Sequence, residues 1–253
     1  MGKRVLPKTL FRFSNPDSPH FLKELSDKKL YFSNPALFND PFDCRIEYLR
    51  IVREALLNHG ISDEDTVKRL EQQIELIISN IGICCFSRAR KNQLMWSHYA
   101  KSHEGICIGF NRQRLLKDIE PNYVEDVVYQ SKHPLTDFDV NLWLLAYKSS
   151  LDDKKILRTI IWHLLKTKYR YWQYERETRL ILKKNGAYDI NPATIRTITF
   201  GLRASNETKL RVYDALSSSE WKHVEILESA RVNERYALDF VPARTPFYAQ
   251  KLS

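Results

Sequence analysis

An uninterrupted apolar run, Ile81-Gly82-Ile83-Cys84-Cys85-Phe86, is the feature that most limits how this chain can fold. A strand with apolar side chains on both faces needs cover on both faces, so we expect it at the centre of a sheet. Other short strands are predicted before and after it, with helices between them. This order of elements indicates an α+β fold in which helices pack around one sheet.

The remaining elements follow from hydrophobic periodicity and capping residues. One amphipathic helix is predicted from its N-cap Ser62 to Ser79, with four core residues, Val67, Leu70, Ile74 and Ile77. Other helices are predicted over 19–27, 92–100, 141–172 and 205–216, and strands over 9–13, 29–32, 104–110, 124–129, 176–183, 195–200 and 223–229. We therefore predict a single domain over 1–253, with a helical insertion over about 45–80 and a long helical segment over about 141–172.

The cysteines and the N-terminus bear on the compartment. Four cysteines occur without a Cys-x-x-Cys pair, a spacing that fits neither a disulfide framework nor a zinc knuckle. The sequence shows no signal peptide and no apolar stretch of about 18 residues. We expect a soluble cytoplasmic protein with free thiols and no membrane partner.

The formal charge of +9, from 40 Lys and Arg against 31 Asp and Glu, favours a polyanionic partner. Nucleic acid, a phosphate-rich cofactor and an acidic protein all meet that description. Familiar catalytic motifs are absent: there is no phosphate-binding loop, Gly-x-Gly-x-x-Gly, Gly-x-Ser-x-Gly or His-Glu-x-x-His. These absences argue against standard nucleotide hydrolysis, Rossmann redox chemistry and serine-hydrolase chemistry.

Arg12 is the first candidate functional residue. It lies between Phe11 and Phe13 on the first predicted strand, and strand alternation places it on the face opposite both rings. A buried guanidinium without a partner is costly, so Arg12 either meets an anion of the protein or a ligand, or lies at the surface.

The segment from Tyr31 to Asp43 combines two prolines, two asparagines and two aspartates with three phenylalanines. The turn-forming residues fix the backbone, and the rings anchor it to the core. Such a loop holds its polar groups rigidly, as a binding loop does, although a structural loop would have a similar composition. Its candidate ligand contacts are Tyr31, Ser33, Asn34, Asn39 and Asp40, and Ser87 is a further candidate at the end of the central strand.

A late strand carries the candidate carboxylates. Alternation places Glu175, Glu177 and Arg179 on one face of it. Carboxylates in an apolar strand need partners, so we expect Arg179 to pair with one of them and to leave the other for chemistry. The alternative is an exposed ladder of charges at the start of the strand.

Several of these segments together resemble one bacterial family. They are Phe32-Ser33-Asn34-Pro35, Phe38-Asn39-Asp40-Pro41-Phe42-Asp43, Cys85-Phe86-Ser87, Leu94-Met95-Trp96-Ser97-His98-Tyr99-Ala100, Gly105-Ile106-Cys107-Ile108-Gly109-Phe110, Trp172, Tyr174-Glu175, Glu177 and Arg179. In this order they resemble the family called domain of unknown function twenty-nine-seventy-one, over about residues 10–201. The family name carries no activity.

The order of motifs is also similar to that of ADP-ribosyltransferases, particularly the DNA-modifying toxins among them. Those enzymes place a His or Arg on the first strand, an aromatic–Ser pair on the second and a catalytic Glu on a late strand. The resemblance implies a central, mostly antiparallel, split β-sheet with flanking helices. It also implies that Arg12, Tyr31 to Ser33 and Glu177 occupy the three positions.

This resemblance gives each residue an expected role with NAD as the substrate. Glu177 would stabilise the oxocarbenium-like charge on the ribose, Arg12 would pair with the pyrophosphate, and Tyr31 would stack on nicotinamide. Arg12 and Glu177 would then approach each other across a cleft floored by the loop over 31–43.

Three functional hypotheses follow. The first is an NAD-consuming toxin or phage-defence effector of ADP-ribosyltransferase type, with a nucleic-acid acceptor and an antitoxin or defence-system partner. The second is a Mg²⁺-dependent nuclease in which Asp40, Asp43, Glu175 and Glu177 supply oxygen ligands. The third is a non-catalytic module that binds nucleic acid or protein.

Overall fold

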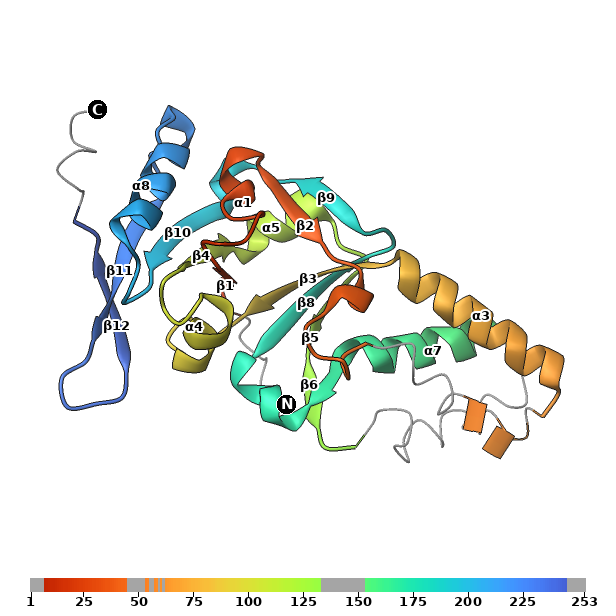
Figure 1. The fold of residues 1–253 in the computed structure, drawn as a ribbon. Coiled ribbons are helices and arrows are strands. Elements are labelled where there is room, and N and C mark those ends of the chain that lie inside the picture. Colours follow the sequence, from red (N-terminus) through yellow and green to blue (C-terminus); the bar gives the residue numbers. More distant parts are fainter. Residues whose placement is uncertain are drawn as a thin grey trace.

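A computed structural model describes residues 7–44, 53–54, 57–58, 60, 62–132 and 153–244 (Figure 1). Its main sheet contains β1 (Thr9–Ser14), β3 (Gly82–Ser87), β4 (Ile106–Asn111), β5 (Tyr123–Asp126), β8 (Glu177–Leu182), β10 (Ile195–Phe200), β11 (Glu225–Arg231) and β12 (Leu238–Pro242). Within the described residues the strand order is β12-β11-β10-β4-β1-β3-β8-β5. Only β10 and β11 are parallel neighbours in this sheet, so it is mostly antiparallel, as predicted.

Two small sheets and several helices surround the main sheet. β2 (Lys29–Phe32) pairs antiparallel with β9 (Gly186–Asp189), and β6 (Val128–Gln130) pairs parallel with β7 (Thr167–Tyr169). The described α-helices are α1 (Lys23–Ser26), α3 (Glu64–Asn80), α4 (Gln93–Tyr99), α5 (Arg112–Ile119), α7 (Asp153–Lys166) and α8 (Asn206–Ala215). Helices α3 and α7 lie side by side at one end of the molecule (Figure 1).

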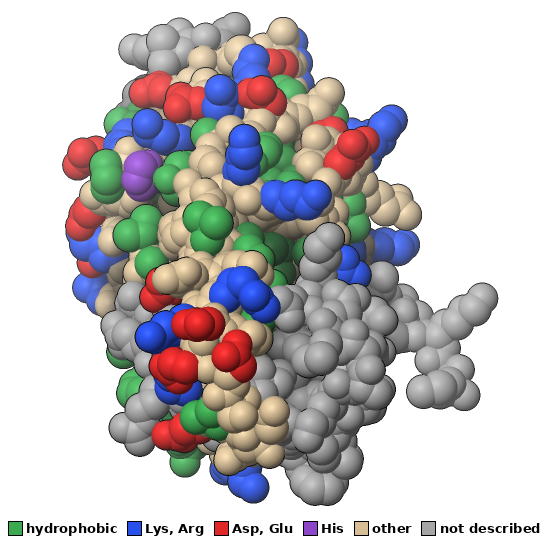
Figure 2. All heavy atoms as spheres, turned by 90° about the vertical axis from the view of Figure 1, so that its right-hand side faces the viewer, with side chains coloured by type: hydrophobic (Ala, Val, Ile, Leu, Met, Phe, Trp, Pro, Cys, Tyr) green, Lys and Arg blue, Asp and Glu red, His purple; other side chains and the backbone are tan. Residues whose placement is uncertain are grey.

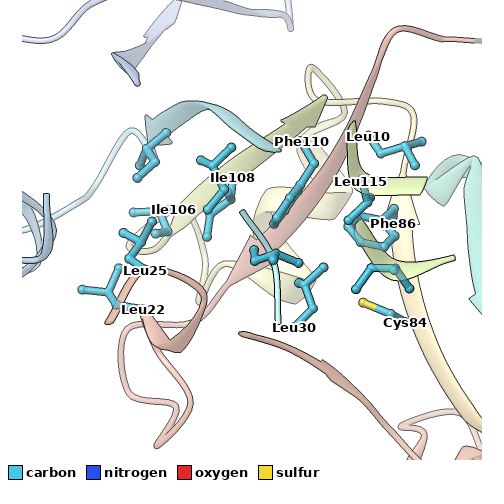
Figure 3. Close-up of a cluster of buried hydrophobic side chains, with 14 of the residues drawn as sticks. Leu10, Leu22, Leu25, Leu30, Cys84, Phe86, Ile106, Ile108, Phe110 and Leu115 are labelled. Atoms are coloured by element: carbon cyan, nitrogen blue, oxygen red, sulfur yellow. The ribbon is translucent and has the colours of Figure 1, made fainter. Parts of the chain in front are cut away.

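The central position predicted for the apolar run is confirmed, because β3 lies inside the sheet with a core on each face. On one face Phe86 packs edge-on against Phe110, with the ring centroids 5.4 Å apart, among the residues of Figure 3. On the other face Ile83 joins the core that α3 and α7 cover. The apolar side chains on each of the two faces of β3 therefore pack against a buried core.

Helix α3 differs from its prediction at two positions. The N-cap is Asp63, whose side chain accepts a hydrogen bond from the Thr66 N–H at 2.9 Å, and not Ser62. The buried stripe continues to Ile78, while Ile77 is 37% exposed. The reason is that the helix turns by 100° per residue, so a stripe through Leu70 and Ile74 is continued best by a residue four positions further on.

The long segment predicted as helix over 141–172 is only partly helical. Helix α7 ends at Lys166, and Thr167–Tyr169 forms β7 alongside β6, followed by a 3₁₀ helix, η4 (Arg170–Glu175). Pairing with another strand overrides the helical pattern here. Residues 133–152, and 45–52 of the predicted insertion, lie outside the described residues. The predicted strand over 124–129 is likewise divided, into β5 and β6.

The sheet opens between β1 and β3. β1 pairs with β4 at every position from Thr9 to Ser14, but it meets β3 only through Phe11 and Ser87. Beyond that pair the two strands diverge, and the end of β2 reaches β3 through a bridge between Ser33 and Ile83. Side chains from both faces of β1 and β3 line the candidate site at this opening.

The described charges do not form a single patch on the face that Figure 2 shows, where Lys and Arg side chains are interspersed with Asp and Glu. All four cysteines, Cys44, Cys84, Cys85 and Cys107, are free thiols, as predicted. No helix among the described residues is long and apolar enough to cross a membrane.

Trp96 gives a direct test of the packing around α4. Its side chain is fully buried, its ring meets Phe13 edge-on at 5.1 Å, and its indole N–H donates to the Arg90 carbonyl at 2.9 Å. We expect Trp96→Ala to lower the free energy of unfolding by about 3–5 kcal/mol, measured by urea denaturation. A loss below about 1 kcal/mol would contradict this placement of the helix.

Candidate active site

A pocket of about 310 Å³ lies where β1 and β3 separate, a volume suited to a small molecule. Seven of the eight residues predicted as catalytic or binding residues line it. They are Arg12, Tyr31, Ser33, Asn39, Asp40, Ser87 and Glu177. Because these residues come from β1, β2, β3, β8 and the loop after β2, the opening of the sheet brings together positions that are far apart in the sequence.

The eighth residue, Asn34, does not line the pocket. Its side chain caps a 3₁₀ turn, η1 (Pro35–Leu37), by accepting from the Ala36 N–H at 2.8 Å. Its amide nitrogen donates to the Ser79 carbonyl at the end of α3. Asn34 therefore shapes the loop through these two hydrogen bonds, and its predicted ligand contact stays a prediction.

Three carboxylates of the pocket gather around the ammonium group of Lys168. The Lys168 Nζ lies 2.8 Å from Glu175 Oε2, 3.3 Å from Glu177 Oε2 and 3.4 Å from Asp43 Oδ2. All four side chains are at most 9% exposed. The pocket wall thus contains a compact, buried group of charges.

Arg179 contacts two of these carboxylates, and its side chain is completely buried. Its Nε donates to Glu177 Oε1 at 2.7 Å, and its Nη2 donates to Asp43 Oδ2 at 2.6 Å. Its Nη1 donates to the Leu165 carbonyl at 2.9 Å. The predicted pairing of Arg179 with one of the two glutamates is confirmed for Glu177. The other, Glu175, is held by Lys168, so the prediction that it is left without a partner is wrong.

The two glutamates reach the pocket from different elements. Glu177 begins β8, where it faces Ser87 across the strand pair. Glu175 ends η4, and Arg176 between them adopts a left-handed conformation with φ of 46°. This turn, and not strand alternation, places both carboxylates in one pocket, so the predicted strand is one residue too long at its start.

Two tyrosines fix these segments. The Tyr99 hydroxyl donates to Glu175 Oε1, and the Glu177 N–H donates to the Tyr129 oxygen at 2.8 Å. Burial raises the pKa of both phenols, and the nearby carboxylates raise these pKa values further. Both phenols therefore stay protonated at neutral pH, and Tyr99 remains a donor to Glu175.

The surroundings drive the pKa values of the two glutamates apart. Burial acts to raise the pKa of Glu177, but Arg179 and Lys168 outweigh it and lower that pKa well below the ordinary value of 4.5. For Glu175, burial prevails over Lys168, and the pKa is raised. The two neighbouring carboxylates therefore differ in their affinity for a proton, Glu175 holding one more readily than Glu177.

Arg12 reaches the pocket from the other face of the sheet. It faces Ile108 of β4, whereas Phe11 faces Ser87, which in turn faces Glu177, so alternation puts Arg12 and Glu177 on opposite faces. Both line the pocket because β1 and β3 diverge there. Arg12 was expected to meet an anion if it is not at the surface. The structure pairs it with Glu24, whose Oε1 lies 3.0 Å from the Arg12 Nη1.

Rings and apolar side chains form the rest of the wall, with Phe11, Phe13, Leu37, Phe38, Met95 and Trp172 among them. The Lys168 ammonium lies 5.1 Å from the centre of the Trp172 ring, and the Arg179 guanidinium lies 5.6 Å from the centre of the Phe38 ring. The pocket therefore combines a charged wall with aromatic faces on which a planar ligand can stack.

Two pocket residues, Lys168 and Tyr99, were not predicted to be functional. Lys168 falls within the segment predicted as a long helix, and Tyr99 falls within a short helix whose apolar residues suggest core. A lysine between aromatic residues, as in Lys168-Tyr169-Arg170-Tyr171-Trp172, is the signal that could have indicated a partly buried cation.

The four acids of the nuclease hypothesis are not arranged alike. Asp43, Glu175 and Glu177 meet at Lys168, while Asp40 accepts a hydrogen bond from the Phe42 N–H at 2.9 Å. Among the described residues, no group of three or more His, Cys, Asp or Glu side chains is arranged to hold a metal ion. Lys168 and Arg179 supply the positive charge that neutralises these carboxylates.

Comparison with known proteins gives a family match over part of the chain. Residues 95–180 match the family described as "Protein of unknown function (DUF2971)". No curated protein and no solved structure matches this chain. The matched residues run from α4 into β8, and they include Tyr99, Lys168, Glu175 and Glu177 of the pocket. The resemblance predicted from the motifs is thus confirmed for residues 95–180, a narrower range than 10–201.

Proposed function

We propose that this protein cleaves the bond between nicotinamide and ribose in NAD, as an ADP-ribosyltransferase or NAD glycohydrolase. One observation carries the proposal: Arg12, Tyr31, Ser33 and Glu177, which stand in the motif order of those enzymes, line one pocket. Arg12 and Glu177 lie on opposite faces of the sheet, and both line the pocket at the place where β1 and β3 diverge.

The two glutamates suit the proposed reaction. The glycosidic C–N bond breaks with its electron pair leaving on nicotinamide, and positive charge develops on the ribose. Glu177, ionised because Arg179 and Lys168 lower its pKa, is the carboxylate suited to stabilise that charge. Water or an acceptor hydroxyl then forms the new C–O bond and gives up a proton. Glu175, whose pKa is raised, is proposed to take that proton.

The rest of the pocket suits the rest of the substrate. Nicotinamide is a planar ring that can stack on an aromatic side chain such as Tyr31. Arg12 is proposed to pair with the pyrophosphate. The pyrophosphate would compete with Glu24 for the Arg12 guanidinium. Ser33 and Asn39 are proposed as polar contacts to the substrate.

Incubation of the purified protein with NAD, and separately with nucleic acid and Mg²⁺, tests the proposal. We expect NAD to be consumed and nicotinamide to be released in the presence of EDTA, with the nucleic acid left intact. Cleavage of nucleic acid that requires Mg²⁺ would favour the nuclease. Neither reaction, with measurable binding of nucleic acid or protein, would favour the non-catalytic module.

The acceptor is proposed to be a nucleic acid that approaches along η4. Tyr169 and Tyr171 are 45% and 67% exposed and flank Arg170, whose guanidinium lies 5.5 Å from the centre of the Tyr171 ring. The next residue, Trp172, lines the pocket. Exposed rings alternating with a cation are the features with which proteins stack the bases of single strands, at about 1–3 kcal/mol per base.

If this surface binds a single strand, affinity should depend on salt, because each neutralised phosphate releases counterions. We expect the affinity for a single-stranded oligonucleotide, followed by fluorescence anisotropy, to fall roughly tenfold or more between about 50 and 200 mM salt. Tyr171→Ala should weaken binding, whereas Tyr236→Ala, at a fully exposed ring on the β11–β12 connection, serves as the matched control. Affinity that does not change with salt would argue for a different acceptor.

A further inference from the structure

The Lys168 ammonium is the point at which three segments of the chain meet. It contacts Asp43 from the loop after η1, Glu175 from η4 and Glu177 from β8, at 2.8 to 3.4 Å. Lys168 itself comes from β7, and only 9% of its side chain is exposed. A long, flexible lysine held this way has lost most of its conformational freedom, a cost that its contacts must offset.

The charges explain why a cation belongs there. Three carboxylates that converge in a buried site repel one another, and repulsion of this kind drives protons onto such groups. Arg179 contacts Asp43 and Glu177, but only Lys168 among the described basic residues contacts Glu175. Burial acts to lower the pKa of Lys168, yet the three carboxylates outweigh it and raise that pKa, so the ammonium stays charged.

We propose that Lys168 is a built-in counter-cation that positions Asp43, Glu175 and Glu177, at the place where carboxylate clusters in other proteins hold a divalent metal ion. It acts through the carboxylates and is therefore a positioning residue. Its ammonium occupies the space between the oxygens and satisfies them with N–H donors, so the pocket keeps its geometry without a metal.

The proposal predicts that removal of the ammonium opens a cation site. Lys168→Ala leaves the oxygens of Glu175, Glu177 and Asp43 directed toward a space that Mn²⁺ can enter, because hard divalent cations prefer carboxylate oxygens. Lys168→Arg keeps the positive charge and should exclude the metal. The double variant Lys168→Ala, Glu175→Gln also lacks the carboxylate that depends most on Lys168. It should lose most of the gain in Mn²⁺ affinity that Lys168→Ala shows.

Titration with MnCl₂, with free Mn²⁺ followed by electron paramagnetic resonance, tests these variants. We expect Lys168→Ala to bind one Mn²⁺ at least tenfold more tightly than the wild-type protein and Lys168→Arg do. Equal Mn²⁺ affinity of Lys168→Ala and wild type would overturn the proposal, as would unchanged tight binding in the double variant. Failure of the NAD proposal would leave these outcomes unaffected, because the titration measures metal binding and not turnover.

A second measurement applies if Lys168→Ala does not fold. Lys168→Gln has a long polar side chain without the charge, and carboxyl ¹³C resonances report the titration of Glu175 directly. We expect the Glu175 pKa to be higher in Lys168→Gln than in the wild type, because glutamine lacks the positive charge that favours the ionised carboxylate. In Lys168→Arg the positive charge is kept, so the Glu175 pKa should lie near the wild-type value. An unchanged Glu175 pKa in Lys168→Gln would show that the ammonium is not its counter-cation.

Discussion

Glu177→Gln should lower the rate of nicotinamide release by about 100-fold or more, the usual effect of losing one electrostatic contact to a transition state. Glutamine keeps the length of the side chain, and its amide oxygen can still accept the hydrogen bond from the Arg179 Nε. What it lacks is the negative charge that is proposed to stabilise the developing charge on the ribose. The measurement is the initial rate of nicotinamide release at saturating NAD.

Two controls make this result specific. Glu75→Gln changes an exposed carboxylate on α3, away from the pocket, and should leave the rate unchanged. Thermal unfolding of both variants must show that the assay temperature lies below the transition, because Glu177 is also a partner of two buried cations. A Glu177→Gln protein that is folded and fully active would remove Glu177 from the mechanism.

The largest loss of stability is expected from Arg179→Met. Methionine fills similar space but leaves Asp43 and Glu177 without their guanidinium partner in a fully buried site. Removing one side of a buried ion pair costs about 3–5 kcal/mol, since the remaining charge stays desolvated. Urea denaturation measures this loss, and Arg158→Met on the exposed side of α7 should stay within about 0.5 kcal/mol of wild type.

The same network fixes a direction for the pH dependence of stability. Because the folded state lowers the pKa of Glu177 below 4.5, its contribution is present above that pH and is lost as the pH falls toward the folded pKa. Wild-type stability should therefore decrease in acid more steeply than that of Glu177→Gln. Parallel stability curves for the two proteins below pH 4.5 would contradict the lowered pKa.

Local patterns in the sequence predicted the central strand and most of the pocket. The apolar run of β3 could be placed inside the sheet because both of its faces needed cover, and the sheet order confirms this. The loop after β2 could be identified as rigid from its turn formers and rings, and Ser33, Asn39 and Asp40 do line the pocket. In each case the physical cause acts within a few residues.

The remainder of the site depends on contacts that no short pattern contains. Lys168 enters the pocket because β7 pairs with β6, which is distant in the sequence, and this pairing ends the predicted helix. Glu175 joins Glu177 through the left-handed conformation of Arg176. Arg12 reaches the same pocket only because β1 and β3 diverge after a single pair of residues. Each of these is a tertiary effect that overrides local propensity.

Release of nicotinamide from NAD, followed by ¹H NMR in the presence of EDTA, tests the central claim most directly. The free nicotinamide resonances should grow as those of NAD decline with wild-type protein, and should stay at background with Glu177→Gln. NAD that remains intact with the folded wild-type protein and a single-stranded oligonucleotide as the proposed acceptor, or nicotinamide release at equal rates by both proteins, would contradict the proposed NAD-cleaving site.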